Sequence, residues 1–457
     1  MFNLYSNELV PADPVGEREA VRLVEVESHR EGLYRRASRR PVRSPYRRAM
    51  PPADPSADWA ASGVVALTGR PEGPPVVPPG HAASAARVLG DQLALASAEA
   101  VVLDGRGLLA ERAAVTGAAR RGSEAVGGGS RILPTADGWA AVSCARPDDP
   151  ALLGALVGEP ITGDPWPVVA GWLREHPGAE LAERATLLGL AAAPLRRPAL
   201  PPPFRALPPR PVAGLLVVDF SALWAGPLCA HLLGLAGARV VKVEIPQRLD
   251  GARRGNAEFY RMLHAGHESV VLDPAEPAGR RALLALVAAA DIVIEASRPR
   301  ALAGFGLDAA AAVARGSTWV SITAAGRSSD RVGFGDDVAA AAGLVARDID
   351  GAPLFCGDAL GDPLAGLTAA ALAMTAPADG SGVLWDVAMA DVVARTLDAP
   401  TVSPSPAARS TPDGWVVDTS AGPVAVAAPR RRWVLGVAPA AGADTAAVLG
   451  NLGIPVP

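Results

Sequence analysis

One aspartate stands where the sequence could support nucleophilic chemistry. Asp362 follows Gly361 and directly precedes an Ala-rich stretch with the character of a helix. A short polar side chain at such a place commonly forms a turn or caps the first amides of the helix. The same helix start also favours an ionised carboxylate, which can attack an electrophilic carbonyl. The residue types alone leave both interpretations open.

Two glycine-containing segments are further candidates for binding a ligand or an oxyanion. The loop Ala225-Gly226-Pro227 lies between an apolar run and a helix-like run, so its amides and the helix dipole could face an anion. Gly226 would let a ligand approach the backbone closely, although an ordinary turn that binds nothing explains the loop as well. The three glycines Gly127, Gly128 and Gly129 could offer bare amides to an oxyanion, or could form a plain flexible linker.

The elements around Asp362 and Gly226 alternate between strand and helix patterns. Continuous apolar runs of strand length, with helical stretches between them, predict a parallel sheet that is covered on both faces. The predicted strands are 215–220, 239–244, 269–273, 292–296 and 319–323, and the predicted helices are 227–235, 277–289 and 301–315.

The sequence predicts four segments along the chain: a basic arm, a smaller domain, a linker and a large domain. Residues 196–211 read RRPALPPPFRALPPRP, and proline at this density continues neither helix nor sheet, so this segment is expected to be a semi-rigid linker. Residues 57–195 form a smaller α/β domain and residues 212–457 a large domain. Residues 1–56 read as a basic arm, with eight arginines between Arg30 and Arg48. Few aromatic residues accompany them, which argues against a nucleic-acid arm.

Composition excludes several other classes of protein. A net charge of −4 over 457 residues predicts neither a nucleic-acid partner nor a membrane surface. The three cysteines are too few and too scattered for a disulfide framework or a zinc site, so no metal is expected. The start of the chain lacks the features of a signal peptide, and no apolar run is long enough to span a bilayer. A cytoplasmic protein is expected.

A faint internal repeat links the two sides of the linker. Residues 61–93 and 342–372 both run from a small-Gly pair through an apolar strand to a Gly before an Ala-rich helix. When the two segments are aligned, Gly80-His81 falls against Gly361-Asp362. A second aspartate is therefore absent from the position where the repeat would place it, which predicts one competent site in each chain.

The run from Val217 to Pro246 resembles the opening of the class III CoA-transferases, the CaiB/BaiF type, which include formyl-CoA and carnitinyl-CoA transferases and alpha-methylacyl-CoA racemase. The similarity continues in order through ADIVIEASRPRALAGFGLD, GDDVAAAAGLV, GDALGDPLAGLTAAALA and GSGVLWDVAMADVV. It implies a Rossmann-like CoA-binding domain after the linker, with the smaller α/β domain in permuted order relative to the family. It also implies an acyl-CoA and a carboxylic acid as partners, and a homodimer or a pseudo-dimer of halves.

The resemblance assigns roles to individual residues. Asp362 matches the aspartate nucleophile of the family, and the glycines at 127–129 match the loop that covers its intermediates. The implied contacts with coenzyme A are Trp224, Ala225, Gly226, Pro227, Lys242, Arg298 and Pro299. The implied reaction moves CoA from an acyl-CoA to an acid through an aspartyl anhydride and an aspartyl-CoA thioester.

Departures from the family pattern keep other interpretations open. Where the family has two cations before its third strand, this chain has His267 and Glu268, so a catalytically impaired CoA-binding homologue or partner subunit is an alternative. A racemase would need a histidine where Phe334 stands, and is disfavoured. Asp336 or Asp337 could help to position a substrate, or could be solvated turn acids. Arg253, Arg254 and Arg327 remain available as cations. A dinucleotide oxidoreductase is disfavoured because no G-x-G-x-x-G follows the first strand.

Overall fold

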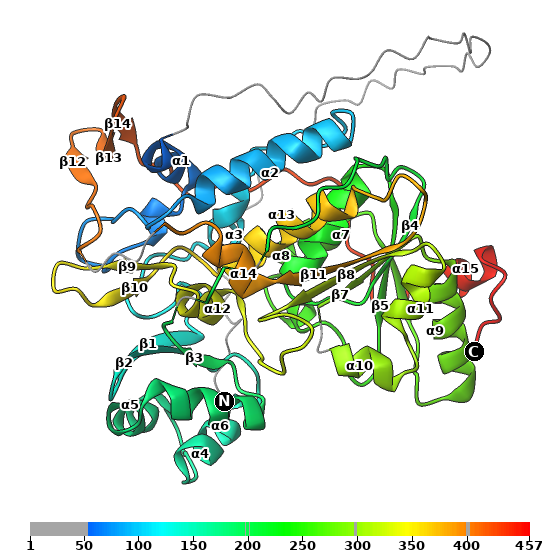
Figure 1. Ribbon diagram of the computed structural model, residues 1–457, viewed down its shortest axis with the longest axis horizontal. Coiled ribbons are helices and arrows are strands. Elements are labelled where there is room, and N and C mark those ends of the chain that lie inside the picture. Colours follow the sequence, from blue (N-terminus) through cyan, green and yellow to red (C-terminus); the bar gives the residue numbers. More distant parts are fainter. Residues whose placement is uncertain (1–53, 197, 201, 297–298, 399–402) are drawn as a thin grey trace, which may run out of the picture. The chain divides into compact units, whose positions relative to one another are not determined.

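The computed structural model describes residues 54–196, 198–200, 202–296, 299–398 and 403–457 (Figure 1). Residues 1–53, most of the predicted basic arm, lie outside the described residues. The first helix, α1, begins at Pro55, inside the predicted arm, and Asp54 caps it by accepting a hydrogen bond from the amide of Ser56. Residues 54–457 fall within one compact unit, so the parts on either side of the Pro-rich segment pack together.

A six-stranded parallel sheet forms the centre of the part after the Pro-rich segment (Figure 1). Its strands lie in the order β11-β8-β7-β4-β5-β6, and every neighbouring pair is parallel. The strands are β4 (Leu216–Asp219), β5 (Arg239–Glu244), β6 (Glu268–Val271), β7 (Ile292–Glu295), β8 (Thr318–Thr323) and β11 (Val383–Ala388). Numbered along the chain this order is 3-2-1-4-5-6, the doubly wound order of Rossmann folds, which confirms the predicted α/β sheet.

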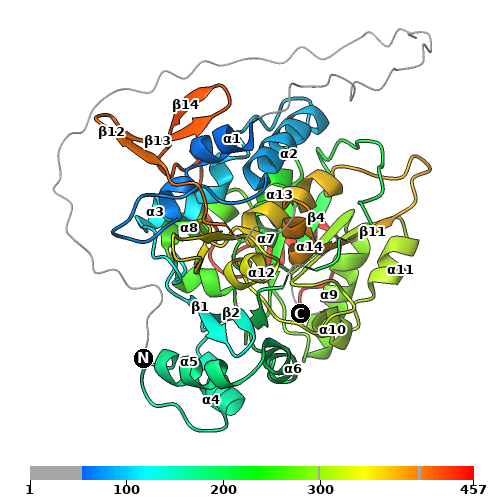
Figure 2. The same ribbon diagram turned by 60° about the vertical axis from the view of Figure 1, so that its left-hand side comes forward.

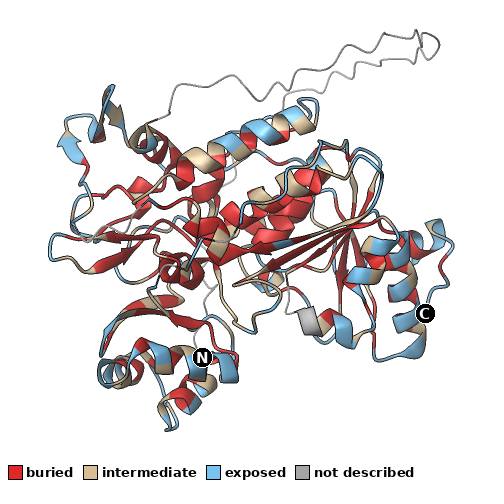
Figure 3. Ribbon diagram, viewed as in Figure 1, coloured by how far each residue is buried: buried red, intermediate tan, exposed pale blue. Residues whose placement is uncertain are grey.

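Helices cover both faces of this sheet. Buried side chains of alternate strand residues pack on one face against α7 (Ala225–Leu235), α8 (Ala257–His264), α13 (Gly361–Ala373) and α14 (Met389–Ala394). The other face packs against α9 (Pro277–Ala289), α10 (Pro299–Gly304), α11 (Ala309–Ala314) and α15 (Thr445–Asn451). The strands are therefore buried on both sides, as Figure 3 shows, which explains why they read as continuous apolar runs.

The part before the Pro-rich segment holds a second, antiparallel sheet. Strands β1 (Ser130–Thr135), β2 (Gly138–Ser143) and β3 (Ala192–Pro194) pair in sequence order. Their apolar side chains pack with those of α4 (Asp149–Val157), α5 (Trp166–Glu175) and α6 (Gly178–Leu188). In the turned view of Figure 2 these helices lie beside that sheet, away from the large parallel sheet. Strands β1 and β2 form a hairpin around the turn at 136–137.

The remaining elements include two further antiparallel sheets, β9-β10 and β12-β13-β14. In chain order, these elements are α1 (Pro55–Ser62), η2 (Val65–Leu67), α2 (Ala82–Ala96), η3 (Gly107–Ala110), α3 (Glu111–Thr116), η4 (Gly251–Arg254), α12 (Gly335–Ala341), β9 (Val345–Arg347), β10 (Pro353–Phe355), β12 (Arg409–Thr411), β13 (Gly414–Thr419) and β14 (Gly422–Ala425). The predicted single helix at 301–315 is wrong: the turn at Gly306, whose φ is +86°, separates α10 from α11.

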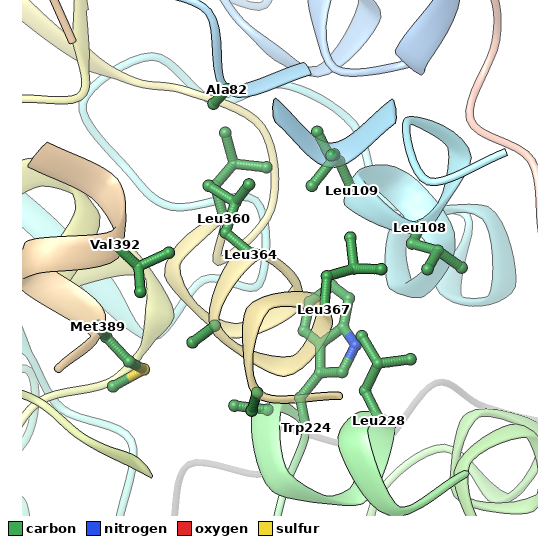
Figure 4. Packing of buried hydrophobic residues seen from close by; sticks show 14 of the residues in the cluster. Ala82, Leu108, Leu109, Trp224, Leu228, Leu360, Leu364, Leu367, Met389 and Val392 are labelled. Atoms are coloured by element: carbon green, nitrogen blue, oxygen red, sulfur yellow. The ribbon is translucent and has the colours of Figure 1, made fainter. Parts of the chain in front are cut away.

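The two segments of the internal repeat lie side by side. Helix α2 of the first packs against helix α13 of the second, and the amide of Gly357 donates to Thr68 Oγ1 at 3.0 Å. The core around α13 includes its N-cap residue Leu360, which lies near Ala82 of α2 in Figure 4. Leu367 of α13 lies near Trp224, the N-cap residue of α7 (Figure 4). The start of α13, where Asp362 lies, is thereby fixed from both sides of the Pro-rich segment.

Candidate active site

The loop after β4 lies at the point where the strand order reverses. Strand β4 neighbours both β5 and β7, and the chain leaves β4 into α7 on one face and β7 into α10 on the other. Open α/β sheets bind ligands in the crevice at this position, outside the carboxyl ends of the strands. The structure therefore places Trp224, Ala225, Gly226 and Pro227 where such a crevice is expected.

Close packing explains the glycine of this loop. A Cβ atom at Gly226 would lie 2.1 Å from Ser221 Cβ and 3.5 Å from Ala296 Cβ, the residue after β7. Helix α7 begins at Ala225, two residues earlier than predicted, with Trp224 as its N-cap residue. Leu223 adopts a φ of +69°, a conformation that side chains other than glycine rarely take and that recurs at functional sites.

Gly226→Ala tests this packing. The added methyl group should force the loop away from Ser221 and lower the free energy of unfolding by about 1–3 kcal/mol, measured in urea. The control is Gly450→Ala in α15, where a Cβ would meet nothing within 4 Å and no loss is expected. Equal unfolding midpoints for Gly226→Ala and the wild type would show that the loop has room for a side chain.

Lys242 does not lie at the surface. Its side chain is 1% exposed; Nζ lies 3.0 Å from Asp250 Oδ2 and donates to the carbonyl of Ser221 at 2.7 Å. Lys242 therefore ties β5 to the loop before α7 from inside the core. The contact with coenzyme A that the family resemblance implies for Lys242 stays a prediction, and this burial does not favour it. Arg298 lies outside the described residues, and Pro299 is the first residue of α10.

The other cations expected near CoA are mostly engaged with carboxylates. Arg253 pairs with Glu244 and Arg327 with Glu295, whereas Arg254 is exposed. His267 does not replace a missing cation, because burial lowers its pKa to about 3 and leaves the ring neutral. Glu268 pairs with Arg239 at 2.6 Å. The departure from the family pattern at 267–268 is therefore a real loss of positive charge.

Asp362 lies in the first turn of α13, where two helices meet. Its half-buried carboxylate accepts a hydrogen bond from the amide of Gly335, the first residue of α12. In the reverse direction, the amide of Ala359 donates to Asp336 Oδ1 at 2.8 Å. Ala359 adopts a φ of +47°, so the turn that presents Asp362 is strained. These contacts hold the two carboxylates at one small site.

Arg112 reaches this site from the other side of the Pro-rich segment. Its Nε donates to Asp358 Oδ2 at 2.9 Å, and a second N–H group donates to the other oxygen of Asp358. Its guanidinium also lies over the indole of Trp224, 5.0 Å from the ring centroid. A Cβ atom at Gly127 would lie 3.2 Å from Arg112 Nη2. The predicted glycine loop and the predicted CoA loop thus both contact one arginine beside Asp362.

Burial controls the acidity of these carboxylates. Desolvation raises the pKa of Asp362 to about 7, although Arg112 and the Gly335 amide oppose the rise. The pKa of Asp336 is also raised to about 7, by burial first and by Asp358 and Asp362 as neighbouring charges, again against Arg112. Desolvation therefore opposes the ionised form of Asp362 that the helix start favours.

Asp337 lies next to this site, in the first turn of α12, and is held by hydrogen bonds. The interpretation of Asp337 as a solvated turn acid is wrong: its carboxylate is buried and accepts hydrogen bonds from Ser143 Oγ at 2.9 Å and from the amide of Phe334 at 2.8 Å. Burial raises its pKa to about 6. Ser143 belongs to β2, so this bond joins the antiparallel sheet to the start of α12.

Sequence reasoning missed Arg112 and Asp358. Nothing in the local pattern around either residue distinguishes it, because the two are 246 positions apart and meet only in the fold. A search for acids clustered near Gly361 could have found Asp358, since it precedes Asp362 by four positions in the same Gly-rich turn.

One cavity of the described residues lies away from Asp362. A cavity of about 480 Å³ lies between α10, α11 and the sheet, where Glu295, Trp319 and Arg327 line it and Asp362 does not. Among the residues that the structure describes, no three His, Cys, Asp or Glu side chains are grouped so that they could hold a metal ion. Within the same residues, no helix combines the length and apolarity needed to cross a membrane.

Part of this chain is similar to known CoA-transferases. Residues 212–434 match the model of CoA-transferase family III. A succinyl-CoA–D-citramalate CoA-transferase of Chloroflexus aurantiacus is 29% identical over 210 residues, which cover 42% of this chain and 52% of that protein. A succinate–glutarate CoA-transferase of Agrobacterium fabrum is 28% identical over 211 residues, with 41% and 53% covered. The chain thus spans about half the length of the curated relatives it matches.

A solved structure also aligns with part of the chain. The crystal structure of a CAIB/BAIF family protein from Brucella suis aligns with a TM-score of 0.40 at 26% identity, covering 46% of this chain and 66% of that chain. The residues before 212 lie outside the family match.

Proposed function

Because the chain belongs to CoA-transferase family III, we propose that it moves CoA from an acyl-CoA thioester to a carboxylic acid, with Asp362 as the covalent carrier. The observation that carries this proposal is the position of Asp362. Its carboxylate is half-buried at the meeting of α12 and α13, and Arg112 links it to both predicted loops. A carboxylate is the nucleophile this chemistry needs, since the enzyme itself passes through the state of an activated acid.

The proposed reaction is a series of acyl transfers. The Asp362 carboxylate attacks the thioester carbonyl, the C–S bond breaks, and a mixed anhydride and CoA thiolate result. The thiolate then attacks the Asp362 carbonyl, which releases the donor acid and leaves an aspartyl-CoA thioester. An acceptor carboxylate attacks this thioester, its C–S bond breaks, and a second anhydride and CoA thiolate result. The thiolate finally attacks the acceptor carbonyl, which restores Asp362. The amides at 127–129 would stabilise the oxyanions of these steps.

The direct test is CoA exchange between acids. Succinyl-CoA is the first donor to use, because two of the relatives are named for succinyl or succinate transfer. The protein is incubated with this donor and a panel of dicarboxylic acids, and new acyl-CoA species are separated by chromatography. Formation of an acceptor thioester with release of succinate supports the proposal. Release of succinate and free CoA without any new thioester would indicate a hydrolase instead.

The raised pKa of Asp362 predicts the pH dependence of the first step. A protonated carboxyl group does not attack, so below pH 7 the rate should fall about tenfold for each unit of pH, and above pH 7 it should level off. Single-turnover release of the donor acid, followed by rapid quenching and chromatography, measures this rate. A rate that does not change between roughly pH 5 and pH 8 would exclude a nucleophile with this pKa.

The alternative function is a CoA-binding homologue or partner subunit without transfer activity. The loss of cations at His267 and Glu268 and the engagement of Arg253 and Arg327 with carboxylates favour it. Such a protein would bind CoA in a calorimetric titration but form no new thioester. A racemase has less support, since Phe334 occupies the place of its second acid or base and packs near Arg146.

The assembly and location of the protein are also proposals. The Asp362 site takes residues from both sides of the Pro-rich segment, and the repeated helices α2 and α13 pack together, which supports a pseudo-dimer within one chain. A homodimer and the permuted domain order remain predictions, as does a cytoplasmic location, which agrees with three free cysteines.

A further inference from the structure

Arg112 belongs to α3, before the Pro-rich segment, yet its guanidinium lies among groups that follow that segment. It pairs with both oxygens of Asp358, whose side chain is 1% exposed, and lies over the indole of Trp224. Its own alkyl chain and head are 24% exposed, so the guanidinium is oriented by its partners and not by solvent. A bidentate pair of this kind fixes the plane and the position of the guanidinium.

The guanidinium of Arg112 lies close to several carboxylates of the candidate site. Asp358 and Arg112 both lie close enough to Asp336 and Asp362 to affect the pKa values of these two carboxylates, Asp358 raising them and Arg112 lowering them. Asp358 takes both hydrogen bonds that Arg112 donates in the pair. The remaining effect of Arg112 on Asp362 is therefore through space, across the same small site.

We propose that Arg112 is a positioning residue for Asp362: its guanidinium, held by Asp358 and Trp224, supplies the positive charge that the nucleophile faces. The part of the chain before the Pro-rich segment thus completes the site in cis. This inference rests on the proposed transfer function for its chemical meaning. It assigns a role to a residue that lies outside the part of the chain matching the family model.

Two substitutions should act in opposite directions. Arg112→Gln removes the cation, so the pKa of Asp362 should rise by about one unit or more. Asp358→Asn removes a neighbouring negative charge while the guanidinium stays over Trp224, so the same pKa should fall. Arg112→Lys keeps the charge and should leave the pKa near that of the wild type. A residue that served only to hold the fold would not produce shifts of opposite sign.

The pKa of Asp362 can be measured without any substrate. The full-length protein is labelled with carboxyl-¹³C aspartate, the Asp362 signal is assigned by its absence in Asp362→Asn, and its titration is followed by NMR. The matched control is Arg106→Gln. Arg106 is 26% exposed and pairs with buried Asp58 at 2.9 Å, so its loss removes a similar ion pair away from the site and should leave the titration unchanged.

The outcomes separate this inference from the proposed function. If Arg112→Gln does not fold, Asp358→Asn and Arg112→Lys carry the test. Unchanged pKa values in Asp358→Asn and Arg112→Gln, or a rise in Asp358→Asn, would overturn the role of Arg112 even if transfer is observed. If the pKa of Asp362 rises in Arg112→Gln and falls in Asp358→Asn but no transfer activity is found, the role of Arg112 is supported and the proposed reaction is refuted. If transfer is observed, Arg112→Gln should lower the rate at pH 7 about fivefold, and the rate should recover at higher pH.

Discussion

Asp362→Asn should lower the rate of CoA transfer by at least about a thousandfold, the usual result when a covalent nucleophile is removed. The substitution keeps the size of the side chain but replaces the attacking carboxylate by an amide. Binding of CoA should change little, since Asp362 is a proposed carrier and not a CoA contact. Rates are measured by chromatography of the acceptor thioester, and affinity by calorimetry.

The control for this experiment is Asp413→Asn. Asp413 is exposed beside the turn between β12 and β13, far from α13 along the chain, and its substitution should leave the rate unchanged. Asp362→Asn with activity near that of the wild type would remove Asp362 from the mechanism. Loss of CoA binding together with activity would instead make Asp362 a binding residue.

Lys242→Met should lower the free energy of unfolding by about 3–5 kcal/mol, the cost of breaking a buried ion pair from one side. Lys242 and Asp250 are each 1% exposed and lie 3.0 Å apart. Methionine would fill the volume but leave the Asp250 carboxylate without its cation, and the carbonyl of Ser221 without a donor. Urea unfolding measures the loss.

Arg239→Gln is the control for Lys242→Met. Arg239 also extends from β5 and pairs with Glu268, but both side chains are about one-third exposed, so the loss should stay below about 1 kcal/mol. A Lys242→Met protein as stable as the wild type, but with weakened CoA binding, would show that Lys242 faces the ligand and not Asp250.

The sheet could be predicted because its strands carry strong local signals. The bounds of β5 and α9 agree with the prediction. The apolar run of β5 and the proline at the start of α9 mark these elements within a few residues of sequence. The strand order needed the structure, because periodicity does not say which strands are neighbours. The helix at 301–315 failed for a local reason: an Ala-rich stretch hides the turn at Gly306.

The site was only partly predictable. Asp362 and the loop at Gly226 follow from motifs within short stretches, so the sequence could point to them. The charges around Asp362 could not be predicted, because Arg112 and Asp358 meet through folding alone and because the pKa of Asp362 depends on burial. Lys242 shows that a lysine in a strand motif can be buried against an aspartate in the core, so its predicted contact with coenzyme A remains untested.

The most direct test of the account is to trap the covalent carrier. The protein is mixed with succinyl-CoA and hydroxylamine, digested, and its peptides are analysed by mass spectrometry. If Asp362 carries the CoA, a hydroxamate should form on Asp362 only when the donor thioester is present. An unmodified Asp362 in a protein that still transfers CoA, or modification at a different carboxylate, would contradict the account.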